Sequence, residues 1–238
     1  MRESAPGVLI TRSESEAQAT ATRVAALGHR PILSPAIRIV PRTLSLAGLG
    51  RLQAVLVTSG NAIASLPATL HATPLLAVGD ATAARARSAG FWRVSSAGRD
   101  AAALAQLARL SCDPDGAPLL VAAGESQGGR LVGSLRRRGF RVARRVAYAT
   151  RPCGRIADAA WDEMAAGQVR AALFFSPASA LAFVGAMRRR GPAACARMTP
   201  VTAIAISPAT ADALSPLPWA GIRVASAPNQ DELLACLK

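Results

Sequence analysis

The stretch Arg-Val-Ala-Arg-Arg-Val-Ala-Tyr-Ala-Thr (residues 141–150) decides how this chain is organised. Its apolar side chains Val142, Val146 and Tyr148 lie at even spacing, which predicts a strand. Tyr148 is the only tyrosine in 238 residues. The stretch also lies between two halves whose sequences resemble each other. A unique phenol at such a junction is either a catalytic acid or an aromatic side chain packed at a domain edge, and the sequence leaves both readings open.

Short apolar runs alternate with helical segments through both halves. The expected strands are 8–12, 31–33, 37–40, 54–57, 75–78 and 94–95 in the first half, and 119–122, 141–150, 171–175, 201–206 and 223–225 in the second. Expected helices include 180–190, 211–214 and a last helix capped by Asp231. The halves also align: residues 58–62 match 176–180, and residues 78–83 match 206–211. This repeat predicts an α/β fold with two similar α/β domains and mostly parallel sheets.

The composition favours a water-soluble enzyme or binding protein. Hydrophobic residues make up 51% and aromatic residues only 4%, so Ala, Val, Leu and Ile must form the core. The apolar runs are shorter than the roughly 20 residues of a spanning helix, and residues 1–7 lack the apolar core of a signal peptide. A cytoplasmic protein without a membrane partner is expected. Four scattered cysteines and two histidines make a metal site improbable.

The formal net charge of +14 comes almost wholly from arginine, because Lys238 is the sole lysine. Arginine binds carboxylates and phosphates bidentately, so an anionic ligand is plausible. A GC-rich genome would produce the same bias, and the runs 136–138 and 188–190 suit solvated helix ends before glycine. Nucleic-acid binding is a further hypothesis. It is disfavoured because basic residues are not interleaved with aromatic ones.

Small hydroxyl-bearing residues follow the expected strands. In parallel α/β sheets, ligands bind beyond the carboxyl ends of the strands, where helix N-termini favour anions. Several such loops would form a cradle for a polyanion. Simple helix capping is the alternative for each loop taken alone. Gly or Pro beside the hydroxyl argues against capping as the whole explanation. The candidate substrate-binding residues are Arg12, Thr58, Ser59, Asn61, Thr82, Ser176, Ser179, Ser207 and Thr210.

Familiar catalytic motifs are missing from the sequence. There is no G-x-G-x-x-G after the first strand, no Walker A motif and no G-x-S-x-G. Residues 124–129 are rich in glycine but lack the lysine and the spacing of a phosphate-binding loop. Asp158, Asp162 and Glu163 share one expected helix and are interpreted as exposed charge.

Taken in order, several motifs resemble those of the uroporphyrinogen-III synthase family. Each motif is weak alone, and the resemblance rests on their order along essentially the whole chain. The motifs are residues 8–12, 58–62, 78–83, Tyr148, 175–180 and 206–211.

The resemblance implies an architecture. Residues 1–37 with 150–238 would form one discontinuous α/β domain, and residues 38–149 a second domain inserted into it. The family's domains are joined by a two-stranded linker, with the active-site cleft between them. The crossings would fall near residues 37–41 and 148–152, which would place Tyr148 at the rim of the cleft.

The resemblance also implies an activity. The family cyclises hydroxymethylbilane, a linear tetrapyrrole with eight carboxylates, to uroporphyrinogen III without a metal or organic cofactor. Tyr148 matches the family's candidate catalytic acid, Thr58, Ser59 and Thr210 match positions near the cleft, and the family is monomeric. Ser207 departs from the family's usual glycine. A non-catalytic two-domain protein that binds an acidic small molecule is the alternative.

Overall fold

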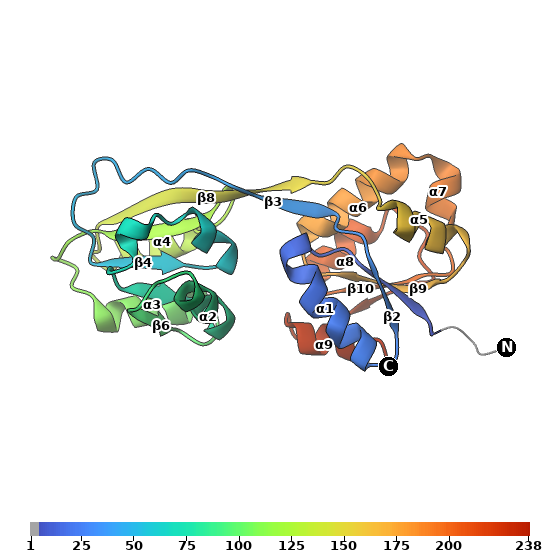
Figure 1. Cartoon of the computed structure of the whole chain (residues 1–238), viewed down its shortest axis with the longest axis horizontal. Coiled ribbons are helices and arrows are strands. Elements are labelled where there is room, and N and C mark those ends of the chain that lie inside the picture. Colours follow the sequence, from blue (N-terminus) through green and yellow to red (C-terminus); the bar gives the residue numbers. More distant parts are fainter. Residues whose placement is uncertain (1–4) are drawn as a thin grey trace. The chain divides into compact units, whose positions relative to one another are not determined.

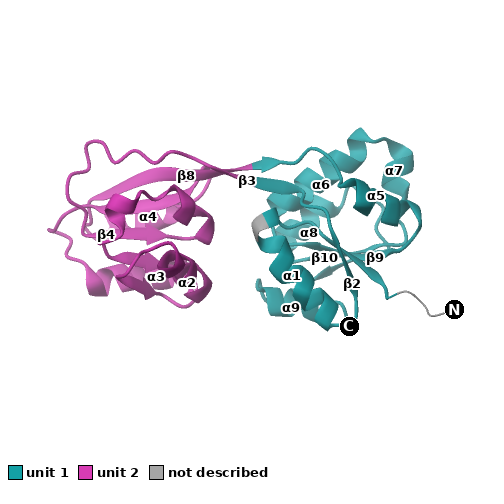
Figure 2. Ribbon diagram, in the orientation of Figure 1, with its two compact units in different colours: residues 1–38, 151–238 teal, residues 39–150 magenta. Residues whose placement is uncertain are grey.

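The computed structural model describes residues 5–238, apart from the side chain of Ser15, and the chain forms two compact units (Figures 1 and 2). Unit 1 comprises the residues up to 38 together with 151–238, and unit 2 comprises residues 39–150. The boundaries that the family resemblance implies lie one residue before the observed ones, at 37/38 and 149/150 instead of 38/39 and 150/151. The α/β fold with mostly parallel sheets is confirmed.

Unit 1 contains a five-stranded sheet within the described residues, in the order β11-β10-β9-β1-β2. All its neighbouring strands run parallel. The strands are β1 (Gly7–Ile10), β2 (Arg30–Leu33), β9 (Val169–Phe174), β10 (Thr202–Ala205) and β11 (Gly221–Val224). The helices are α1 (Glu14–Ala26), α5 (Asp158–Ala165), α6 (Pro177–Arg189), α7 (Pro192–Ala196), α8 (Pro208–Leu214) and α9 (Gln230–Ala235).

The sheet of unit 2 has six strands among the described residues, in the order β3-β8-β7-β4-β5-β6. Strands β8, β7, β4, β5 and β6 are mutually parallel. The strands are β3 (Ile37–Pro41), β4 (Ala54–Val57), β5 (Leu75–Ala77), β6 (Val94–Ser96), β7 (Leu119–Gly124) and β8 (Val142–Pro152). The helices are the 3-10 helices η1 (Gly60–Ser65) and η2 (Ala68–Leu70), and α2 (Asp80–Ser88), α3 (Ala101–Ser111) and α4 (Gly129–Arg136).

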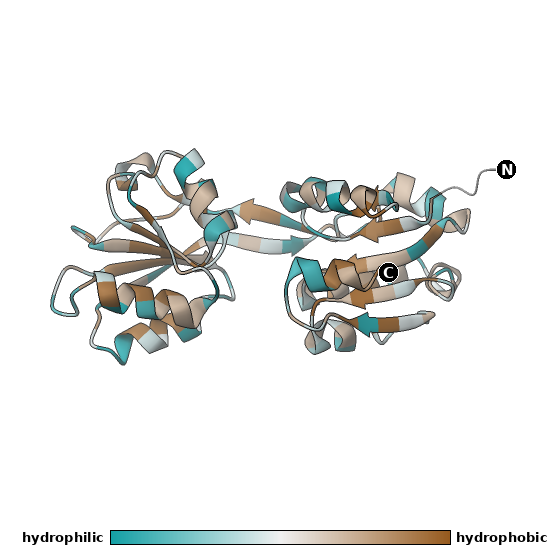
Figure 3. Cartoon of the chain, turned by 90° about the horizontal axis from the view of Figure 1, so that it is seen from below, coloured by the Kyte–Doolittle hydropathy of each residue, from teal (hydrophilic) through white to brown (hydrophobic). Residues whose placement is uncertain are grey.

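Both faces of each sheet are buried, as the continuous apolar runs of the strands require. Along β4, Ala54 and Leu56 pack with α3 and α4, whereas Val55 and Val57 pack with η1 and α2. Along β1, Leu9 joins the core under α5 and α6, while Val8 and Ile10 face α1 and α9. Figure 3 shows the resulting hydrophobic strands in each unit. No helix within residues 5–238 has the length and hydrophobicity to cross a membrane.

Strands β3 and β8 carry the chain across the boundary between the units, and they pair with each other. The backbone N–H of Arg42 donates to the carbonyl of Ala147 at 2.8 Å. The backbone N–H of Cys153 donates to the carbonyl of Ala36 at 2.8 Å. These pairings run in opposite directions along the two strands, so the pair is antiparallel. The two-stranded linker that the resemblance implies is therefore present as a paired crossing.

Some helix boundaries differ from the sequence prediction. Helices α6 and α8 begin at Pro177 and Pro208, three residues earlier than predicted, because proline is favoured at the first helical position. The short helix α7 was not predicted. The cap of the last helix is Asn229, whose side chain accepts from the N–H of Glu232, so the prediction of Asp231 as the cap is wrong.

The prediction that Glu163 is merely exposed charge is also wrong. Arg30 on β2 forms a bidentate pair with Glu163 on α5, at 2.5 and 2.7 Å. The two side chains are 32% and 31% exposed. The hydrogen bonds from Arg30 hold the pKa of Glu163 below its usual value, although burial acts in the opposite direction. The pair joins segments 133 residues apart in the sequence.

Glu163→Gln tests this pair through the pH dependence of stability. Because the folded pKa of Glu163 is lowered, the pair stabilises the fold above the unfolded pKa of about 4.3 and loses its effect as the pH falls through the folded pKa. At neutral pH we expect the variant to lose about 1 kcal/mol of unfolding free energy or less. Denaturant unfolding over a pH series measures this difference, which should disappear in acid.

Asp231→Asn is the matched control. Its carboxylate pairs with Arg23 but is 78% exposed, so water screens the pair and the loss should be smaller. A deficit of Glu163→Gln that stays constant from neutral to acid pH would contradict the ion-pair explanation.

Candidate functional site

The candidate residues lie at the carboxyl edges of the two parallel sheets. In unit 1, β1 leads into Arg12, β9 into Ser176, and β10 into Ser207. In unit 2, β4 leads into Thr58, and β5 leads into the segment that reaches Thr82. Since the strands that carry these residues are parallel within each sheet, each set gathers at one edge of its own unit. This is the edge where α/β proteins bind ligands.

Two of the unit 1 loops are built as helix caps. The Ser176 hydroxyl accepts from the backbone N–H of Ser179 at 3.2 Å, and the Ser207 hydroxyl accepts from that of Thr210 at 3.4 Å. Each cap is followed by proline at the first helical position, which has no N–H. In the sequence, Pro beside the hydroxyl argued against simple capping. In the structure, proline is instead part of the capped helix start, because the first helical position needs no N–H donor. Of the first three residues in each helix, proline has no N–H and the third donates to the cap, so one N–H is left, that of Ala178 in α6 and of Ala209 in α8.

The backbone conformation at position 207 does not require glycine. The φ of −159° and ψ of 161° at Ser207 are those of an extended residue. The Ser207 hydroxyl lies 3.0 Å from the hydroxyl of Thr210, which is fully buried. Replacement of the family's usual glycine therefore adds a cap and a hydroxyl pair without straining the backbone.

Arg12 is held by three neighbours within unit 1. Its Nε donates to the carboxylate of Glu16 at 2.8 Å and its Nη1 donates to the amide oxygen of Gln230 at 3.0 Å. The guanidinium carbon lies 4.6 Å from the centre of the Phe175 ring. The side chain is thereby fixed at the carboxyl edge, half-buried, with part of its charge balanced by Glu16.

In unit 2, Thr58 differs from the other hydroxyl-bearing candidates. The Ser59 hydroxyl accepts from the backbone N–H of Asn61 at 3.2 Å and so caps η1. Thr82 is buried in the first turn of α2. By contrast, Oγ1 of Thr58 is buried and has no hydrogen-bond partner among the residues described. Because an unpaired buried hydroxyl costs free energy, Thr58 is the candidate with unused binding capacity.

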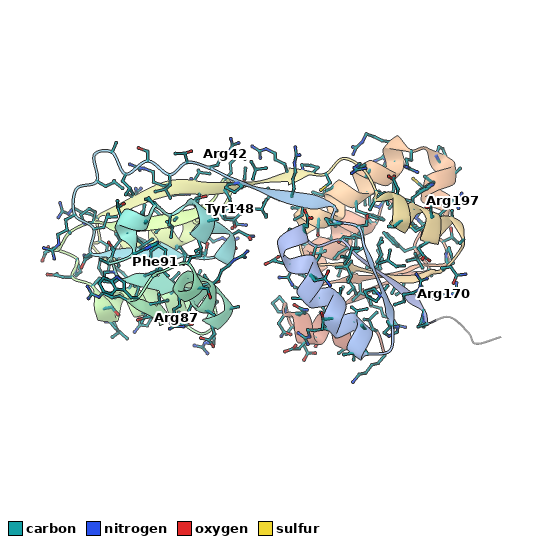
Figure 4. The ribbon with its side chains drawn as sticks, in the orientation of Figure 1. Arg42, Arg87, Phe91, Tyr148, Arg170 and Arg197 are labelled. Atoms are coloured by element: carbon teal, nitrogen blue, oxygen red, sulfur yellow. The ribbon has the colours of Figure 1, made fainter. Side chains whose placement is uncertain are left out.

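Tyr148 lies on β8 with its ring inside unit 2, where Figure 4 labels it. The ring is only 3% exposed and belongs to the core formed with η1 and α2. Its hydroxyl donates to Oε1 of Gln127 at 2.8 Å. The packed arrangement that the sequence left open is therefore present, and the hydroxyl is directed toward the exposed loop after β7.

Arg144, also on β8, fixes this loop through three main-chain carbonyls. Its Nη2 donates to Gly124 at 2.9 Å and to Glu125 at 2.6 Å, and its Nε donates to Gln127 at 2.8 Å. The Arg144 guanidinium thus positions Gln127, the residue whose side chain accepts the hydrogen bond from the Tyr148 hydroxyl. Sequence reasoning missed Gln127 and Arg144, because their contacts depend on the pairing of β7 with β8, which the sequence does not show.

Gly124 allows the Tyr148 ring to approach β7. A Cβ atom at Gly124 would lie 2.9 Å from Cζ and 3.1 Å from the hydroxyl oxygen of Tyr148. The register between β7 and β8 shifts beside Gly124, which pairs with Tyr148. Glycine is required here by the close approach of an aromatic ring.

Fold and site together define a two-domain α/β protein with hydroxyl groups and arginine at the carboxyl edges of parallel sheets, a class suited to binding anionic small molecules. The family model for uroporphyrinogen-III synthase HemD matches residues 18–235. The chain therefore belongs to the uroporphyrinogen-III synthase family.

Solved structures agree with this fold. The uroporphyrinogen-III synthetase of Helicobacter pylori 26695 aligns over 98% of this chain and 98% of its own, with 18% identity and a TM-score of 0.63. A mutant uroporphyrinogen III synthase of the extremely thermophilic bacterium Thermus thermophilus aligns over 98% and 96%, with 20% identity and a TM-score of 0.50. A search of curated proteins gave no match.

Gly124→Ala tests the packing of the tyrosine. The added methyl group overlaps the buried ring, so we expect a loss of about 1–3 kcal/mol in unfolding free energy. Thermal and denaturant unfolding measure it. Gly129→Ala is the control, because its Cβ meets no atom within 4 Å and it begins α4, where alanine is at least as favourable as glycine. Equal stability of the two variants would contradict the close packing of Tyr148 on β7.

Proposed function

We propose that this chain cyclises hydroxymethylbilane to uroporphyrinogen III, with inversion of ring D and loss of water, in tetrapyrrole biosynthesis. The observation that carries this proposal is the family match over residues 18–235. The chemistry makes the protein a lyase that needs no metal or organic cofactor. We further propose that it acts as a monomer in the cytoplasm on a polycarboxylate substrate. Its four cysteines are free thiols, which suits a reducing compartment.

The reaction begins when the hydroxyl of the hydroxymethyl group leaves as water, while its carbon stays on the substrate. A proton donor must protonate the leaving oxygen as the carbon–oxygen bond breaks, giving an azafulvene cation. The terminal carbon then bonds to the substituted position of ring D. The resulting spiro intermediate breaks the original bond between ring D and its methylene bridge, and that bridge carbon then bonds to the free position of ring D, which inverts the ring. The proton lost from that position balances the one given to the leaving hydroxyl. Much of the catalysis is the folding of a flexible chain and the stabilisation of cations.

We assign the proton donor to Tyr148. A tyrosine has an ordinary pKa of about 10, so it is protonated at neutral pH and can donate. Its hydroxyl now donates to Gln127, an exposed residue whose amide can turn toward solvent. Donation to substrate requires the leaving hydroxyl to take the place of Gln127, and Arg144 holds the loop in position for this exchange.

The substrate's carboxylates would meet the carboxyl edges of the sheets. Within unit 1 the amides of Ala178 and Ala209 remain after capping, and Arg12 adds positive charge. Ser176, Ser179, Ser207 and Thr210 shape these loops. Within unit 2, Thr58 offers a hydroxyl that has no partner among the described residues, and Ser59, Asn61 and Thr82 follow strands of the same carboxyl edge. These roles are supported by position, capping and burial.

Cyclisation of enzymatically generated hydroxymethylbilane tests the function directly. The expected product is uroporphyrinogen III, formed faster than spontaneous closure. Formation of only the uninverted isomer I at the spontaneous rate would instead favour the alternative of a non-catalytic protein that binds an acidic small molecule.

Tyr148→Phe tests the acid while keeping the ring. We expect kcat to fall by about 10²–10⁴-fold, as for loss of a general acid, with little change in KM. Unfolding curves confirm that the variant is folded, and Gln127→Leu, which removes the hydroxyl's acceptor but not the acid, should retain more activity. Unchanged turnover of folded Tyr148→Phe would leave Tyr148 with a packing role only.

Thr58→Val tests the unpaired hydroxyl. Because Oγ1 makes no hydrogen bond within the described residues, we expect unfolding free energy to stay level or rise, while KM for hydroxymethylbilane rises about tenfold. Thr11→Val is the matched control for stability. Its hydroxyl is buried and donates to the Leu173 carbonyl at 2.7 Å, so its removal should cost about 1 kcal/mol. A stable Thr58→Val with unchanged KM would remove Thr58 from the substrate site.

A further inference from the structure

Unit 2 contains a groove at the edge of its sheet opposite to the candidate site. It has a volume of about 800 Å³, within the range of small-molecule sites. Its walls come from the segments that precede β4, β5, β6 and β7, together with η2 and the end of α3. The groove therefore lies at the amino ends of parallel strands, within a single unit, and it shares no residue with the carboxyl-edge loops.

Two arginines give the groove its charge. Arg51 and Arg93 both line it and are exposed, and no carboxylate side chain lines it in the described part of the chain. Neither guanidinium has an ion pair or a hydrogen-bond acceptor among residues 5–238. By contrast, Arg12, Arg30 and Arg144 are each held by neighbouring groups. Two guanidinium groups without partners among residues 5–238 line one groove that has no carboxylate in its described lining, and this arrangement favours binding of an anion.

The backbone around these arginines is fixed before any ligand binds. The carbonyl of Arg93 accepts from the N–H of Leu75 at 2.8 Å, and the preceding Phe91, labelled in Figure 4, is buried against His71. The amide Nε2 of Gln53 donates to the carbonyls of Asp113 and Ala117 at 2.7 and 2.6 Å. A wall held in this way loses little conformational entropy when a ligand binds.

The rest of the lining suits a compact ligand with several oxygens. Hydroxyl groups come from Thr69, Thr73 and Ser111, and apolar walls come from Leu52 and Leu70. Such a mixture of cations, hydroxyls and a small apolar floor matches a polycarboxylate or a phosphate compound better than a flat apolar molecule.

We infer that this groove is a second, anion-binding site that takes a small multivalent oxyanion, with Arg51 and Arg93 as its principal ligands. The site is independent of the proposed synthase reaction, since it uses neither Tyr148 nor the carboxyl-edge loops. The oxyanion could be carried by a polycarboxylate or by a phosphate compound, and the two probes of the experiment distinguish these cases.

The experiment measures binding of citrate and of pyrophosphate to the whole chain by titration calorimetry. Arg51→Gln and Arg93→Gln should each weaken binding of the preferred anion about tenfold, and the double variant about a hundredfold. Exposed substitutions of this kind leave stability nearly unchanged, so the variants should fold. Trp92, 75% exposed beside Arg93, serves as a local reporter whose fluorescence response should vanish in Trp92→Phe.

Two controls separate this site from general attraction to a basic protein. Arg109→Gln removes an equal charge from the exposed face of α3 in the same unit, and Arg188→Gln removes one from the exposed last turn of α6 in unit 1, away from both sites. Both should bind the anion as the wild type does. Equal weakening in all variants, or no saturable binding below about 10 mM, would overturn the inference.

Discussion

The backbone pairing of β3 with β8 is the constraint on which both units depend. Unit 2 begins within β3 and ends within β8, so the pair fixes where the chain leaves unit 1 and where it returns. Bringing two points this far apart together carries a loop-closure cost that grows only slowly with length. A complete inserted unit is therefore tolerated as long as its two ends meet, and hydrogen bonds such as that from Arg42 to Ala147 hold them together.

Helix capping and ligand binding compete for the same groups at the carboxyl edges. At three helix starts a serine hydroxyl already accepts a hydrogen bond from a backbone N–H: Ser176, Ser207 and Ser59. In α6 and α8 the first residue is proline, which supplies no N–H donor. Within the described residues, what remains for the proposed substrate is small: single amides, Arg12 and the hydroxyl of Thr58, which has no partner there. A proposed site of this kind would bind through the sum of several weak donors placed on rigid strands. It therefore leaves no compact motif in the sequence.

Local patterns predicted the strands and the parallel sheets, because buried strands read as apolar runs. The position of the crossing, by contrast, was implied only by the resemblance to the family. Helix starts were less certain: a Ser-Pro pair marks a cap and a first turn, and this was misjudged at α6 and α8. Contacts distant in sequence were not predictable. The pair of Arg30 with Glu163, and the bond of Tyr148 to Gln127, depend on register and on which helix covers which face. Tyr148 was a candidate because it is the sole tyrosine and because it matches the family's candidate acid, but its burial could not be predicted from its sequence neighbours.

The place of β1 in its sheet sets an order of events during synthesis. Val8, Leu9 and Ile10 are fully enclosed between β2 and β9, and Thr11 bonds a carbonyl 162 residues further along the chain. A ribosome adds about 5–20 residues each second, so this partner strand emerges on the order of 10 s later. During that time all of unit 2 becomes available to fold, while an apolar strand edge of unit 1 stays open. The nascent chain thus carries a period of exposure to aggregation that the finished protein does not show.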